Sequence, residues 1–317
     1  MKKSSNSFTI LLQKNKGLMW LLILTITLLW GYAWVLMKEV LAYMGPFTFS
    51  SFRFATGSIA LLLIVWLSKK RFPLKRYWKP LLVQGILQTS IVFLLVMYGL
   101  RFVDAGKSSV LLYSMPMWSS LLAGKFLGEK LTSAKWVGLL IGMVGLLTIL
   151  GWDIWIGQSI KVLFGELLII IAAISWGVSN VYFRRKLQHL PKLETNAYQM
   201  LFGTIVMIIV TCLMEWGEPI DLNVHSIYYI LFTGILASAL CFTVWFLILS
   251  LIDMVTATIS TLLVPVFGLL FSSLIIDEKL SVGVLTGSGL IIFGIIVAQV
   301  TRKEKAQRDK ADVQQGR

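Results

Sequence analysis

The sequence predicts an all-α integral membrane protein, with ten transmembrane helices arranged as two inverted five-helix repeats. Three observations support this fold class: the composition, ten apolar stretches of membrane-spanning length, and an internal duplication. Hydrophobic residues make up 57 % of the 317 residues and charged residues 14 %, and the mean hydropathy is +0.82. Soluble domains contain about 45–50 % apolar and about 25 % charged residues. The chain is therefore too apolar for a water-soluble fold.

Each apolar stretch is long enough to cross a bilayer, because roughly 20 helical residues rising about 1.5 Å each cover the roughly 30 Å hydrocarbon layer. The expected spans are 18–37, 47–68, 80–100, 107–127, 132–150, 163–183, 196–215, 226–249, 255–276 and 281–300. The first span is expected to be a retained helix, because it is longer than a signal-peptide core and lacks a small-x-small cleavage site. The predicted parts are an N-terminal tail 1–17, a first repeat 18–150, a linker 151–162, a second repeat 163–300 and a charged tail 301–317.

The basic residues gather on one side of the predicted topology. Most of the 29 Lys and Arg residues lie in the two tails and in the loops that share a side with them, whereas Glu215, Glu218 and Asp221 lie on the opposite side. Cytoplasmic loops of membrane proteins are enriched in Lys and Arg. We therefore expect a multi-pass protein of the cell (plasma or inner) membrane with both termini in the cytoplasm. Because this topology accounts for the net charge of +14, we expect no nucleic-acid partner.

The second half of the chain repeats the first. A shift of 149 residues aligns Gly85 with Gly234, Pro116 with Pro265 and Glu129-Lys130-Leu131 with Glu278-Lys279-Leu280, and a shift of 146 aligns Trp30-Gly31 with Trp176-Gly177 and Arg53 with Gln199. The repeated unit contains five helices, an odd number, so the second copy enters the membrane from the opposite side. Inverted repeats of this kind are typical of secondary transporters, which place the substrate site between the repeats. The duplication therefore predicts alternating access.

Several of these segments resemble a known family. The stretches "LLWGYAWVLMK" and "SFRFATGSIALLL", the two mid-helix prolines and the two "EKL" turns are similar to the EamA family of the drug/metabolite transporter superfamily, over nearly the whole chain. The resemblance implies a ten-helix basket that exports amino acids or other small metabolites. It also implies a central cavity lined mainly by the first, third, fourth, sixth, eighth and ninth helices.

The candidate cavity residues are polar or aromatic side chains near the middle of those spans. They are Trp30, Trp34, Gln84, Gln88, Tyr113, Trp118, Trp176 and Asn180. Trp30 and Trp34 lie one helical turn apart, and the repeat places Trp176 and Asn180 at the equivalent positions. A buried amide or indole in lipid requires a partner, so such groups face the bundle interior. Ordinary packing between helices is the alternative for each of them.

Three further residues stand out inside the spans. Pro116 and Pro265 occupy matched mid-span positions, where a proline removes a backbone hydrogen bond; each is a candidate hinge, with a static kink as the alternative. Arg53 lies about 9 Å into its span at about 1.5 Å per residue. We expect its side chain to snorkel to the headgroups or to have a structural or gating role. In the "EKL" turns, Thr132 and Ser281 are predicted N-caps of the following helices.

The remaining residues exclude most other functions. The acids lie near span ends, no phosphate-binding glycine loop is present, both histidines fall in loops, and the two cysteines have no metal-like spacing. We therefore expect no cofactor, no metal and no enzymatic activity, with an intramembrane enzyme or a receptor as remote alternatives. The predicted partners are the lipid bilayer and a small-molecule substrate; a homodimer is compatible with the sequence, which does not decide it.

The class of transporter is less constrained than the fold. An exporter of amino acids or related metabolites is expected, and a multidrug exporter of lipophilic cations or a metabolite uptake permease are the alternatives. An aromatic cavity that also contains a fixed charge favours zwitterionic substrates, whereas a purely aromatic one favours lipophilic cations. A mid-span carboxylate for proton coupling is not found in the expected spans.

Overall fold

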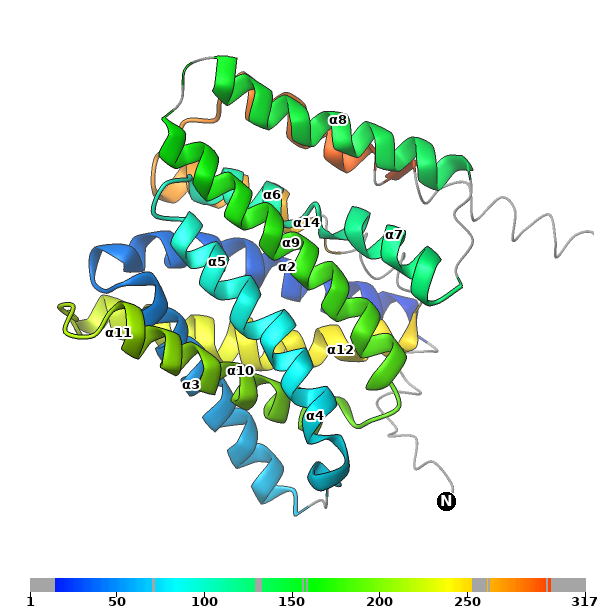
Figure 1. The fold of residues 1–317 in the computed structure, drawn as a ribbon, viewed down its shortest axis with the longest axis vertical. Helices are drawn as coiled ribbons and strands as arrows, with labels where there is room; N and C mark the ends of the chain where they lie inside the picture. Colours follow the sequence, from blue (N-terminus) through cyan, green and yellow to red (C-terminus); the bar gives the residue numbers. More distant parts are fainter. Residues whose placement is uncertain are drawn as a thin grey trace, which may run out of the picture.

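A computed structural model describes residues 15–69, 72–128, 133–155, 157, 159–252, 261, 263–294 and 296–297. Within these ranges the secondary structure consists of helices joined by turns and short loops (Figure 1). Most of the predicted N-terminal tail and all of the charged C-terminal tail lie outside the described residues. The repeat motif at Glu129, the predicted cap Thr132 and most of the segment that precedes Pro265 lie outside them as well.

The helices follow one another in the order that the duplication predicts. The first repeat contains α2 (Lys16–Glu39) with η1 (Val40–Ala42), α3 (Pro46–Leu67), the continuous series α4 (Leu74–Gln84), η2 (Gly85–Ile91) and α5 (Val92–Gly99), the pair α6 (Ala105–Leu112) and α7 (Met115–Phe126), and α8 (Ser133–Trp155). The second repeat contains α9 (Ile160–Lys186), α10 (Lys192–Met214), the series α11 (Val224–Leu231), η3 (Phe232–Leu240) and α12 (Cys241–Leu251), α14 (Leu263–Ile275), and a last helix at Val282–Gly294.

Six of these segments are long and apolar enough to cross a membrane by themselves: Gly17–Ala42, Pro46–Leu67, Leu74–Gly99, Ile160–Lys186, Lys192–Met214 and Val224–Leu251. The other four predicted spans correspond to the α6–α7 pair, α8, α14 and the last helix. The predicted ten-helix membrane fold is therefore confirmed. The helix α8 runs on to Trp155, inside the range predicted as a linker.

The two repeats pack against each other through contacts that recur with the repeats exchanged. A Cβ atom on Gly57 of α3 would lie 2.6 Å from the Gly234 carbonyl oxygen in η3, and one on Gly203 of α10 would lie 2.8 Å from the Gly85 carbonyl oxygen in η2. These four glycines are two pairs of repeat-equivalent positions. Both η2 and η3 are π-helical segments at matched places. Because each contact has its exchanged counterpart, a twofold relation connects the repeats.

The helix α8 and the last helix form a second pair of this kind. In Figure 1 the two run together along one side of the bundle, with α3 on the opposite side. A Cβ on Gly145 would lie 2.6 Å from the Gly287 carbonyl oxygen, and one on Gly294 would lie 2.5 Å from that of Gly138. These glycines allow the two backbones to touch, as small residues do at membrane helix interfaces.

The fourth membrane segment is interrupted. The helix α6 ends at Leu112, and α7 begins at Met115 after Tyr113 and Ser114, so Pro116 lies in the first turn of α7 and not within one continuous helix. Proline is tolerated there because the first turn has no intrahelical acceptor for its missing N–H. Pro265 is likewise near the start of α14. The expected single helix with a central proline is therefore wrong for the first repeat.

Carboxylates cap the helices at the end of the bundle where α3 and α6 begin. Glu215 accepts hydrogen bonds from the Phe47 and Thr48 N–H groups at 3.0 and 2.7 Å. Glu278 of the second "EKL" turn accepts from the Ala105 and Gly106 N–H groups at 2.7 and 3.0 Å. A carboxylate at this position satisfies unpaired N–H groups and complements the helix dipole.

Side chains also bind backbone groups at other helix ends. The predicted N-cap at Ser281 is confirmed, because its Oγ accepts from the Val284 N–H at 3.2 Å. Two repeat-equivalent cations bind backbone carbonyls that follow matched helices. Lys38 donates to the Val103 carbonyl after α5 at 2.8 Å, and Arg184 donates to the Ile252 carbonyl after α12 at 3.2 Å.

Candidate functional site

A small cavity lined by buried side chains lies between the repeats. Its volume is about 20 Å³, and its lining comes from α2, α3, α5, α6, α9 and α12: Trp30, Ala33, Trp34, Met37, Arg53, Phe93, Leu112, Tyr113, Trp176 and Phe242. This space holds about one water molecule. The space that the described residues leave here is therefore smaller than a metabolite.

The wall of the cavity is a cluster of aromatic rings centred on two equivalent tryptophans. The ring centroids of Trp30 and Trp176 lie 6.1 Å apart with their planes at 84°. Phe242 lies 5.6 Å from Trp30, and Tyr113 lies 5.8 Å from Trp176. Edge-to-face pairs of this type stabilise a defined arrangement of rings. The structure thus brings together four of the predicted cavity residues, namely Trp30, Trp34, Tyr113 and Trp176.

Arg53 is the charged residue of this cavity. Only 1 % of its surface is exposed. Its Nε donates to Ser238 Oγ at 2.8 Å and its Nη1 to Met37 Sδ at 2.9 Å. The guanidinium carbon lies 4.5 Å from the centroid of Phe93, as expected for a cation–π contact. The expectation that Arg53 snorkels to the headgroups is wrong, because its helix face points into the bundle.

The other repeat provides a neutral counterpart of Arg53. Gln199 occupies the equivalent position, and its Oε1 accepts a hydrogen bond from Thr89 at 2.9 Å. Thr89 is itself the equivalent of Ser238 under the 149-residue shift. The same helix crossing is therefore held by Arg53–Ser238 in one half and by Gln199–Thr89 in the other.

The two central tryptophans also differ in hydrogen bonding. The Trp30 Nε1–H donates to the Ala237 carbonyl in η3 at 2.8 Å. The Trp176 side chain is 3 % exposed, and its Nε1 has no hydrogen-bond partner among the described residues. Buried N–H groups without a partner are uncommon and costly.

The remaining candidates lie outside the lining of the cavity. Gln84 and Gln88 are buried and bonded to each other at 2.5 Å. Asn180 donates to Met115 Sδ at 3.1 Å, and Trp118 donates to Ser114 Oγ at 3.2 Å beside the break between α6 and α7. Whether these four side chains face a substrate stays a prediction, as does the hinge role of the two prolines.

Sequence reasoning missed a buried ion pair at the end of the bundle where α6 begins. Lys107 of α6 contacts the Glu166 carboxylate of α9, and the two side chains are 7 % and 0 % exposed. The repeat-equivalent positions hold Thr256 and Trp20, which cannot form such a pair. The sequence indicates only that the acids lie near span ends; the packing of α6 against α9 reveals that this pair is enclosed.

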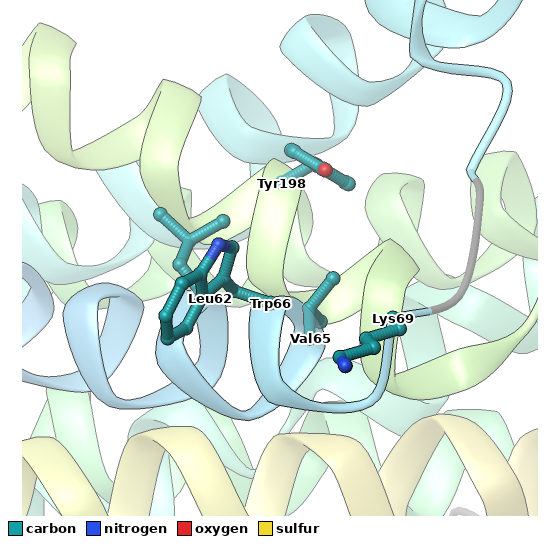
Figure 2. A pocket seen from close by; sticks show the side chains of 5 residues that line it. All are labelled: Leu62, Val65, Trp66, Lys69 and Tyr198. Carbon is teal, nitrogen blue, oxygen red and sulfur yellow. The ribbon is translucent and has the colours of Figure 1, made fainter.

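A second hollow lies on the outer surface and belongs to another part of the molecule. Figure 2 shows this groove, of about 550 Å³, between the last turns of α3 and the facing α10, lined by Leu62, Val65, Trp66, Lys69 and Tyr198. Trp66 is 73 % exposed. Within the described part of the chain, no group of three His, Cys, Asp or Glu side chains could hold a metal ion.

Comparisons with known proteins agree with this architecture. The EamA-like transporter family model matches residues 16–151 and 163–299. The chain is 32 % identical to the uncharacterized transporter YoaV of Bacillus subtilis, covering 88 % of this chain and 96 % of that protein. It is 27 % identical to the uncharacterized transporter YvbV of the same organism, covering 92 % and 94 %.

The fold also matches a solved crystal structure. The TM-score is 0.69 at 20 % sequence identity, and the match covers 89 % of this chain and 97 % of the other. Two family matches in one chain agree with the duplicated architecture. The chain therefore belongs to the EamA-like transporter family and is a multi-pass secondary transporter of the membrane.

Proposed function

We propose that this transporter exports amino acids or related small metabolites by alternating access. The observation that carries the proposal is the exchange of equivalent contacts around the central cavity that the described residues line. Because the same contacts recur when the two repeats are exchanged, the protein can adopt two arrangements of similar energy, one open to each side of the membrane. The glycine crossings at Gly57–Gly234 and Gly85–Gly203 would serve as contacts on which the helices rock.

The charge of the cavity favours this substrate class over lipophilic cations. Arg53 repels a cation, whereas the surrounding rings accept the apolar part of an amino acid or similar metabolite. A multidrug exporter remains the second candidate because the lining is rich in aromatic rings. The excess of Lys and Arg on the side of the termini supports a cytoplasmic location for both ends.

Counterflow in proteoliposomes tests the substrate class. The purified protein is supplied with radiolabelled amino acids or tetraphenylphosphonium, with and without an imposed pH gradient, and protein-free liposomes are the control. Saturable counterflow of an amino acid supports the proposal, and its response to pH reports proton coupling. Movement of tetraphenylphosphonium alone would assign a multidrug exporter instead.

The direction of transport needs a cellular measurement. Cells that express the chain are preloaded with the labelled amino acid identified by counterflow, and its release is compared with that from cells carrying an empty vector. Faster release supports export. Faster net accumulation from the medium would assign an uptake permease.

A further inference from the structure

Among the described residues, the cavity contains a guanidinium with no carboxylate partner and an indole N–H with no acceptor. Arg53 and Trp176 come from different repeats and both line the cavity. Among the described residues, the Arg53 guanidinium bonds only a hydroxyl and a thioether, and no carboxylate accepts from it. The Trp176 N–H has no partner there at all. Burying a guanidinium without a counter-charge costs free energy of hydration. Arg53 and Trp176 therefore form an electropositive site for a bound substrate.

The repeat acts as an internal control for a purely structural role of Arg53. At the equivalent helix crossing, Gln199 forms the matching hydrogen bond to Thr89 without any charge. A neutral side chain therefore suffices to hold this crossing. The positive charge at Arg53 needs a different explanation, which the structure of the crossing does not supply.

The same comparison applies to the tryptophans. Trp30 has its N–H satisfied by the Ala237 carbonyl, whereas the equivalent interaction of Trp176 is missing. Arg53 and Trp176 are thus two positions in the cavity where the twofold relation fails. Among the described residues, the departure at Trp176 leaves an N–H without an acceptor, and the departure at Arg53 adds a positive charge without a carboxylate partner.

We infer that Arg53 and Trp176 bind the carboxylate of the transported substrate. The guanidinium donates charge-assisted hydrogen bonds to the carboxylate oxygens, and the indole N–H donates one more. The rings of Trp30, Phe93 and Phe242 enclose the apolar remainder of the same molecule. This inference rests on the proposed transport of small metabolites and narrows their class to compounds that carry a carboxylate.

Binding to the purified full-length protein tests the inference. Ligand-induced thermal stabilisation is measured for each of the twenty amino acids, then for the amide of every amino acid that binds, and for tetraphenylphosphonium. Replacing the carboxylate by an amide removes the negative charge and keeps the shape. Because a hydrogen bond to a charged group contributes about 1.5–3 kcal/mol, and 1.4 kcal/mol corresponds to tenfold, we expect the amide to bind about tenfold more weakly or worse.

Three variants connect this preference to the two residues, and two others serve as controls. R53Q copies the side chain of the other repeat and is expected to weaken carboxylate binding at least about tenfold while leaving amide binding unchanged. R53K keeps the charge and is expected to retain part of the preference, and W176F to reduce it. The controls K69Q and W66F remove a charge and an indole N–H in the outer groove and are expected to bind like the wild type.

The outcomes separate this inference from the proposed function. Amino-acid binding and counterflow with an unchanged carboxylate preference in both R53Q and W176F would overturn the inference and leave the proposed function intact. Stabilisation by tetraphenylphosphonium alone, or by no amino acid, would overturn both. If R53Q does not fold, the R53K and W176F variants distinguish carboxylate binding from a structural role. A structural role for these residues would not change the ratio of carboxylate to amide affinity.

Discussion

Breaking the buried ion pair between Lys107 and Glu166 is expected to destabilise the protein strongly. Both side chains are enclosed and in direct contact. Two unit charges about 4 Å apart attract by about 4 kcal/mol at an effective dielectric constant of about 20, and burial costs each ion several kcal/mol of hydration. E166Q therefore removes the attraction and leaves the Lys107 ammonium enclosed. We expect a loss of about 3–5 kcal/mol in the free energy of unfolding.

The matched experiment removes both charges together. In K107L/E166L both charges of the pair are gone, so we expect a stability within about 1 kcal/mol of the wild type, or above it, as for other buried pairs replaced by apolar side chains. The free energies are measured by SDS-induced unfolding of the purified protein in detergent micelles. The reasoning is refuted if E166Q is as stable as the wild type, or if the double variant is no more stable than E166Q.

Three other substitutions give independent checks. G85A places a Cβ atom 2.2 Å from a backbone oxygen of α10; it should lower stability by at least about 1–3 kcal/mol, whereas G289A, which meets no neighbour within 4 Å, should leave the SDS midpoint unchanged. E278A removes the carboxylate cap of α6 and should cost about 0.5–2 kcal/mol, with E278Q closer to the wild type in the same assay. P116A/P265A should reduce counterflow more than membrane insertion, and normal counterflow by a well-expressed double variant would exclude the hinge role.

The sequence was sufficient for the fold because lipid constrains it strongly. A membrane span must be a helix of a given length, and an odd number of spans in each repeat fixes their inversion. The pairing of Trp30 with Trp176 also follows from the repeat, since equivalent residues near the twofold axis meet each other. The break between α6 and α7 was missed because a proline indicates only that a helix is perturbed nearby.

The side-chain environment was predicted less well, because it depends on which helix face meets which neighbour. The depth of Arg53 in the membrane allows its side chain to reach the headgroups, which is why snorkelling was expected. The helix face that carries Arg53 is instead turned toward the bundle interior. Glu166 was judged by its place near a span end, yet α6 covers it. The shift of 149 residues relates Thr89 to Ser238, but only the structure shows that Ser238 accepts a hydrogen bond from Arg53.

The duplicated architecture separates two kinds of residue by their physical role. Interactions that recur with the repeats exchanged, such as the glycine crossings and the cations at Lys38 and Arg184, are available in both arrangements of an inverted pair and so do not bias one over the other. Interactions present in one copy alone do bias the system. Lys107–Glu166 links the repeats at one end only, so it favours closure of that end. In the cavity, Arg53 and the Trp176 N–H, which has no acceptor among the described residues, break the symmetry at the place where a substrate, which has no twofold symmetry, would bind.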